Sequence, residues 1–283
     1  MKKIFFSLGL LLIFSIQSCF ASSLDIPAKG YGISFGNSKK LTGIRLNFVD
    51  EGVEKVTGIN LTFWKPKDNL EFQMNGFAFG LFGPKAMTIN GLALGGVGVV
   101  AQQVNGGSLG LIGMTTTVIN GVAIGGIGIF NGSFKGVAIG GFGMVNGEFK
   151  GIGVGGIGVA NENQLGIAIG GIGVIGEDLA GVSVGGIGVA AHNSIKGIAI
   201  GGYGIGSSKI SGIAIAGLRI KTKELKGVGI GAYCRVKREL KGLTVGIFNH
   251  AENLNGIQIG LLNYCKNNPK YLKLLPLINI HID

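Results

Sequence analysis

The stretch that decides the fold is residues 121–160, "GVAIGGIGIFNGSFKGVAIGGFGMVNGEFKGIGVGGIGVA", which states one pattern nearly three times. Self-similarity at a fixed period is typical of repeat architectures. The glycine that opens each repeat recurs along the chain, mostly at intervals of 15 residues. The glycines in this register are Gly32, Gly43, Gly58, Gly76, Gly91, Gly106, Gly121, Gly136, Gly151, Gly166, Gly181, Gly197, Gly212, Gly227, Gly242 and Gly256.

Within a repeat, places are counted from this glycine, and large apolar residues fall at the second, fourth, seventh, ninth and fourteenth places. In the repeat of Gly121 these are Val122, Ile124, Ile127, Ile129 and Phe134. Alternation with period two predicts short strands. The alternation changes parity at Gly125-Gly126, which predicts a glycine corner, and Asn131-Gly132 predicts a turn. The fourteenth place slips by one at Gln164-Leu165.

One repeat cannot bury five large side chains alone, but stacked repeats can. We therefore predict an all-β, single-chain parallel β-solenoid with about 15 residues per coil, large residues inside and flat Gly/Ala faces outside. The alternative is an antiparallel β-barrel of the outer-membrane type, since Asn-Gly is a hairpin signal. The solenoid is favoured because turns do not alternate short and long, the corner breaks the alternation, and aromatic girdles are absent.

Composition supports an ordered repeat protein. The chain has 56 Gly in 283 residues, yet only 5 Pro and no strict Gly-X-Y triplet, which excludes collagen. Apolar residues make up 46% and charged residues 14%, which argues against a disordered glycine-rich linker.

The beginning, "MKKIFFSLGLLLIFSIQSCFA", has the basic, apolar and small-residue regions of a signal peptide over residues 1–21, and its apolar run is too short for a membrane span. We expect cleavage after Ala21. The alternative is lipidation of Cys19, which ends a loose lipobox. Either route predicts an extracytoplasmic location: periplasm, outer membrane or cell surface.

The remaining chain divides by pattern. Residues 22–42 are expected to form an N-terminal lead-in and residues 43–268 the solenoid, with a projecting insertion loop at 64–74. Residues 269–283 drop the repeat and contain Pro269 and Pro276, so they are expected to cap the solenoid and block edge-to-edge growth.

Several stretches together carry a resemblance: "GISFGNSKKLTGIRLNF", "GINLTFWKPK", the "GxxxGGxGV" repeats and the closing "GIQIGLLNYCKNNPKYLKLLPLINIHID". The chain resembles a group of uncharacterised bacterial surface-repeat proteins, which are exported and sometimes lipidated. The resemblance covers nearly all of the chain after the signal peptide. It implies an extracytoplasmic repeat protein and supplies no activity or functional residue.

Basic residues concentrate between positions 209 and 241, although the whole chain carries a formal charge of only +11. Stacking places Lys226 with Lys241 and Lys221 beside Arg235, which predicts a basic stripe along one edge. Such a stripe suits anionic envelope lipid, lipopolysaccharide or acidic polysaccharide. Nucleic acid is not expected, because the predicted location is outside the cytoplasm and no aromatic residue is interleaved as a stacking platform. A merely solubilising edge remains the alternative. The candidate residues are Lys209, Arg219, Lys221, Lys223, Lys226, Arg235, Lys237, Arg238 and Lys241.

Signals for catalysis are weak. Glu148, Glu162 and Glu177 recur at roughly the coil period and could form a cation-binding or glycan-cleaving row with Asp178, but solvated turn residues are the favoured interpretation. The "GxGxxG" match at 151–156 is expected of solenoid corners, since no helical pattern follows it.

Metal-binding signals are equally thin. Cys234, Cys265 and His250 could form a thiol–imidazole cluster, but apolar packing of the two cysteines is favoured. Asn249 and Asn263 predict a structural amide ladder between coils.

The sequence thus predicts an exported, non-enzymatic repeat protein that serves as an envelope or cell-surface scaffold, without catalytic residue, cofactor or metal. Self-association through the flat Gly/Ala faces is a further expectation. The alternatives are an outer-membrane β-barrel protein and a glycan-cleaving β-helix enzyme.

Overall fold

The computed structural model describes residues 23–67, 69 and 71–282, so the expected signal peptide and Cys19 lie outside the described residues. The chain divides into two compact units, residues 1–126 and 127–283. Among the residues described, no helix combines the length and apolar character needed to cross a membrane.

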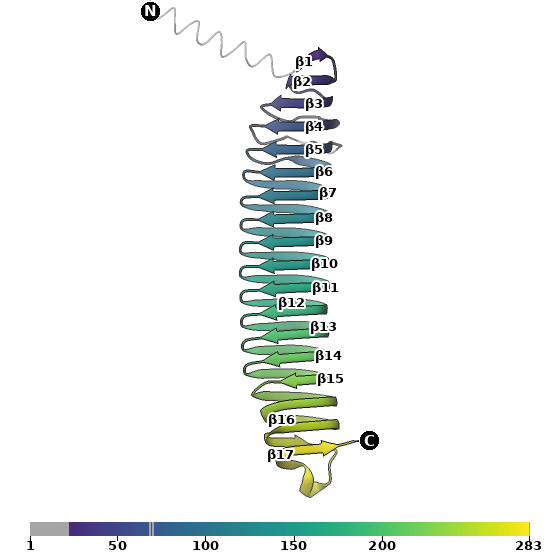
Figure 1. The fold of residues 1–283 in the computed structure, drawn as a ribbon, viewed down its shortest axis with the longest axis vertical. Coiled ribbons are helices and arrows are strands. Elements are labelled where there is room, and N and C mark those ends of the chain that lie inside the picture. The colour runs from purple at the N-terminus through teal and green to yellow at the C-terminus, as the bar shows by residue number, and fades with distance from the viewer. Residues whose placement is uncertain (1–22, 68, 70, 283) are drawn as a thin grey trace, which may run out of the picture. The chain divides into compact units, whose positions relative to one another are not determined.

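The first unit is a stack of strands in which each pairs with the next one along the chain (Figure 1). β1 and β2 pair antiparallel, and the pairs from β2–β3 to β7–β8 are parallel, with Gly76 opposite Gly91 as an example. The strands are β1 (Ser23–Ala28), β2 (Tyr31–Gly36), β3 (Lys40–Asn47), β4 (Lys55–Thr62), β5 (Gln73–Gly80), β6 (Lys85–Gly95), β7 (Gly98–Gly110) and β8 (Gly113–Gly125).

The second unit has the same kind of arrangement, a stack of strands that pair in chain order (Figure 1). Successive strands pair parallel, for example Ile152 with Ile167, until β17 turns back antiparallel on β16. The strands are β9 (Gly128–Gly140), β10 (Gly143–Gly155), β11 (Gly158–Gly170), β12 (Gly173–Gly185), β13 (Gly188–Gly201), β14 (Gly204–Ala216), β15 (Arg219–Ile230), β16 (Tyr233–Cys265) and β17 (Leu274–His281), with the 3-10 turn η1 (Lys270–Leu272) before the last.

Both units therefore have the predicted parallel β-solenoid fold, in which a residue pairs with the residue about 15 positions later. The antiparallel alternative is wrong for these strands. Parallel stacking in register satisfies the backbone groups on both sides of each strand, which offsets the entropy lost on ordering so much glycine.

The register glycines form a corner that only glycine can occupy. All sixteen have positive φ, as at Gly166, where φ is +138°. A Cβ on Gly166 would lie 2.1 Å from the carbonyl oxygen of Gly151 in the neighbouring coil. The predicted Gly-Gly corner is also present, because the strands break between the fifth and eighth places, at Gly141-Phe142 for instance. The predicted turn at Asn131-Gly132 is wrong, since both residues lie within β9.

The direction of the large side chains corrects the predicted core. The ninth and fourteenth places are buried, as at Ile129 and Phe134. At the second and fourth places the large residues point outward, and Ile139 is 44% exposed, while the small residue between them, Ala138, is buried. Size complementarity explains this arrangement. At Gly153, also a third place, a Cβ would lie 2.5 Å from Met144 and 2.8 Å from Phe149 of the preceding coil.

Gln164 does not slip out of register. It occupies the buried fourteenth place, and Leu165 is the exposed neighbour. Its amide accepts a hydrogen bond from Asn161 at 3.4 Å and donates to Ser183 Oγ at 3.0 Å, which satisfies a polar group inside the core. The amide ladder at Asn249 and Asn263 is confirmed by a hydrogen bond of 2.7 Å.

The two ends differ from the repeats between them. β1 pairs antiparallel with β2 and β17 antiparallel with β16, so neither terminal strand offers the parallel template that a further coil would need. The insertion is shorter than the expected loop 64–74, because Gln73 and Met74 already belong to β5. It also packs against the coil rather than projecting, with Phe72 fully buried and Trp64 stacked on Phe48.

A charged network that the sequence did not reveal lies inside the first unit. Arg45 and Asp50 are both fully buried and form an ion pair of 2.5 Å. Asp50 also accepts hydrogen bonds from Asn60 at 3.0 Å and from Thr62 at 2.7 Å. Arg45 occupies a third place, where the next coil carries Asn60 and several later coils carry alanine. The N-terminal coils therefore combine buried apolar side chains, such as Val56, with a polar network held by this ion pair.

Candidate functional site

Four cations of the predicted basic segment lie together on neighbouring coils of the second unit. Thr222 and Val236 are buried, so the residues on either side of each of them point outward. The register pairs Lys221 with Arg235 and Thr222 with Val236. The result is a patch two residues wide and two coils high, which we call the basic cluster: Lys221, Lys223, Arg235 and Lys237.

The basic cluster is held by backbone pairing and by inward anchors. The Thr222 hydroxyl donates to the carbonyl oxygens of Ser208 and Glu224, at 3.2 and 2.9 Å. Neighbouring cations are spaced by about 6.6 Å along a strand and about 4.8 Å between coils. Like charges at this spacing repel one another, so a bound anion would relieve an unfavourable interaction.

The acidic residues of the same segment pair with other cations. Glu224 lies 3.8 Å from Lys209, and Glu239 lies 2.9 Å from Lys241. Within the described part of the chain, no carboxylate is recorded at ion-pair distance from the four residues of the basic cluster. The segment therefore contains a group of paired cations and a group of unpaired ones.

The predicted single stripe is only partly correct. Lys226 and Lys241 do pair in register, as do Lys221 and Arg235. However, the two pairs occupy different places of the coil, and Arg219 lies at a further place, opposite Gly204. The basic residues thus form several short rows around the coil rather than one edge.

A shallow groove runs beside the basic cluster. Its cationic part, of about 270 Å³, is lined by Lys221, Lys223 and Lys237 together with His192. An adjoining stretch of about 890 Å³ shares His192 and also contains Glu162 and Glu177. The surface therefore changes from acidic to basic along consecutive coils.

The proposed acidic row is only partly assembled. Glu162 and Glu177 line the same groove, whereas Glu148 is not among its lining residues. Hydrogen bonds from Ser194 and Asn193 lower the pKa of Asp178. An aspartate kept ionised by two donors suits a structural acceptor better than a proton donor.

The cysteines and histidine behave as packing residues. Cys234 and Cys265 are buried, and His250 stacks on Tyr264 with ring centroids 4.9 Å apart. Burial, with Arg235 as a second cause, lowers the pKa of His250. Across the described residues, no group of three or more His, Cys, Asp and Glu is placed to hold a metal ion.

Cys234 should be inert towards thiol reagents while the protein is folded. Burial raises the pKa of Cys234 to about 12. At a pH close to the usual thiol pKa, almost none of Cys234 is therefore in the reactive thiolate form. We expect iodoacetamide at mildly alkaline pH to leave Cys234 unmodified in the native protein and to alkylate it in guanidinium, as read by peptide mass spectrometry. Rapid alkylation of the native protein would contradict the burial described.

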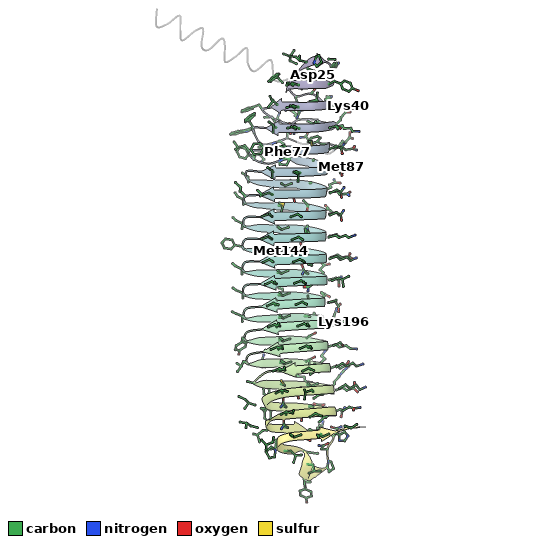
Figure 2. The ribbon with its side chains drawn as sticks, viewed as in Figure 1. Asp25, Lys40, Phe77, Met87, Met144 and Lys196 are labelled. Carbon is green, nitrogen blue, oxygen red and sulfur yellow. The ribbon has the colours of Figure 1, made fainter. Side chains whose placement is uncertain are left out.

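The structure also presents two apolar rows at its surface. The seventh place, which the sequence analysis assigned to the core, is about half exposed, as at Ile157, and so is the tenth place, as at Ile175. Figure 2 shows side chains projecting from the stacked strands, with Lys196 extending away from the ribbon.

Comparison of the chain with protein-family models, curated proteins and solved structures finds no match.

Proposed function

We propose that the protein is an exported, non-enzymatic repeat protein that acts as a scaffold at the bacterial envelope or cell surface. In this proposal the basic cluster contacts anionic envelope lipid or acidic polysaccharide. The proposal combines the signal-peptide pattern with the solenoid, whose stacked coils display side chains at regular spacing on a stable support.

The observation that carries the proposal is the separation of charges in β15 and β16. The acidic side chains of this region face Lys209 and Lys241, while Lys221, Lys223, Arg235 and Lys237 face solvent together. Lipid phosphates and glycan carboxylates are recurrent anions at envelope surfaces, and rows of cations at coil spacing match repeated negative charges.

Charge reversal tests the proposal. We expect the triple variant Lys223→Glu/Arg235→Glu/Lys237→Glu to lose binding to anionic liposomes or lipopolysaccharide by roughly 100-fold, because each basic residue near an anionic surface contributes about 1 kcal/mol, or about fivefold in affinity. Binding is measured by liposome co-sedimentation and by retention on immobilised lipopolysaccharide. Wild-type binding should also weaken as salt is raised.

The matched control reverses three lysines elsewhere in the second unit, Lys135→Glu/Lys150→Glu/Lys196→Glu. These residues lie at the fifteenth place or its equivalent, on exposed positions of other strands. The control variant has the same net charge and should retain most of the binding. Equal losses in both variants would show that net charge alone acts and would remove the basis for the basic cluster as a site.

A further inference from the structure

A bare column of glycines forms the floor of an apolar groove in the second unit. Gly158 pairs with Gly173 and Gly188 with Gly204, and the column continues in register from β9 to β14. Side chains are excluded there, since a Cβ on Gly173 would lie 2.8 Å from the carbonyl oxygen of Gly188. The floor consists of Gly128, Gly143, Gly158, Gly173, Gly188 and Gly204.

Two rows of apolar side chains stand beside this floor. One row lies at the seventh place and includes Phe142, Ile157 and Ile172; the other lies at the tenth place and includes Val145 and Ile175. The large residues of both rows are about half exposed. The rows are three residues apart along the coil, about 10 Å between backbones, so the space between their side chains admits one extended hydrocarbon chain.

The groove is long and continuous. A stretch of about 460 Å³ and a second of about 380 Å³ share Ile172, Gly173 and Ile175. From β9 to β15 there are six coil steps, or about 29 Å. An acyl chain in one leaflet of a bilayer spans about half of the 30 Å hydrocarbon core, so it fits within this length.

Charge appears only at one end of the groove. The glycine column stops where Gly204 pairs with Arg219, and Arg219 and Lys221 complete the lining at that end. The residues described as lining both stretches include no aspartate or glutamate. An apolar channel that ends at a guanidinium and an ammonium is complementary to an apolar chain with one terminal anion.

We propose that this apolar groove binds a long-chain fatty acid, with its chain along the glycine floor and its carboxylate at Arg219 and Lys221. This inference goes beyond the proposed function, because it concerns another surface and another ligand, and only Lys221 lies at both sites. A polysaccharide is a poor occupant, since the walls offer aliphatic and aromatic side chains in place of hydrogen-bonding groups.

Calorimetric titration of the purified protein with palmitate tests the proposal. We expect saturable binding of palmitate, and at least tenfold weaker binding of hexadecanol, which lacks the anion. Arg219→Gln/Lys221→Gln should reduce palmitate affinity at least tenfold and leave hexadecanol unchanged. The matched control Lys135→Gln/Lys150→Gln removes two cations outside the groove and should bind palmitate as the wild type does.

Two variants test the hydrocarbon part. Ala160→Trp places an indole in the groove at a half-buried position of the tenth row, and Ile157→Glu places a charge in the opposite wall. Both should abolish palmitate binding, while Ile152→Glu, on a row outside the groove, should not. Circular dichroism confirms folding of each variant, so the second remains informative if the first fails to fold.

The proposal is overturned if folded Ala160→Trp or Ile157→Glu binds palmitate normally, if hexadecanol binds as tightly as palmitate, or if only diacyl vesicles bind. The variant Lys223→Glu/Arg235→Glu/Lys237→Glu separates the two proposals. It should lose binding to anionic surfaces and keep that of palmitate, so either proposal can fail alone.

Discussion

Replacing Gly166 with alanine should destabilise the second unit more than any exposed substitution. Gly166 has a φ of +138°, which a residue with a side chain adopts at a cost of about 1–3 kcal/mol. The added Cβ would also lie 2.1 Å from the carbonyl oxygen of Gly151. That oxygen belongs to a backbone fixed by pairing on both sides, with Gly136 and with Gly166, so it cannot move away without breaking the register of several coils.

The measurement is thermal and denaturant unfolding followed by far-ultraviolet circular dichroism. Gly206→Ala is the matched control, because a Cβ at Gly206 meets no atom within 4 Å. The control should change the free energy of unfolding by no more than about 0.5 kcal/mol. Identical transitions for the two variants would contradict the role assigned to the positive-φ corner.

Replacing Asp50 with alanine should destabilise the first unit by about 3–5 kcal/mol, because it leaves a buried guanidinium without its counterion. Arg45 is fully buried, and its remaining acceptors are neutral: Asn60 Oδ1 at 2.7 Å and Asn37 Oδ1 at 2.6 Å. The same substitution removes the acceptor of the Asn60 and Thr62 side chains.

The single tryptophan provides a local probe, since Trp64 stacks on Phe48 in the first unit. Denaturant unfolding followed by its fluorescence gives the free energy. The control is Glu51→Ala, at the residue that follows Asp50. It removes the exposed ion pair between Lys67 and Glu51, 2.8 Å long, and should lower the free energy of unfolding by at most about 1 kcal/mol. The double variant Arg45→Met/Asp50→Leu should recover part of the loss, because an apolar pair leaves no uncompensated charge. If Asp50→Ala is as mild as Glu51→Ala, the ion pair does not support the fold.

Much of the fold followed from glycine spacing. A tight period of 15 predicted parallel stacking, and the register glycines coincide with the positive-φ corners. The pairing of Lys226 with Lys241 also followed from the count of residues per coil. The sequence did not predict which cations form ion pairs, because residue spacing along the chain does not tell which lysine lies near Glu224 or Glu239.

The sequence by itself determined the coil length, the parallel register and which residues alternate, because these depend on glycine backbone freedom and on a periodicity of two. It could not determine which alternating set points inward, since alanine at Ala138 and isoleucine at Ile139 are both apolar. Only the tertiary structure decided this: Met144 and Phe149 fill the interior from other sides of the coil and leave room for no Cβ at Gly153. The larger side chains of the second and fourth places therefore face outward.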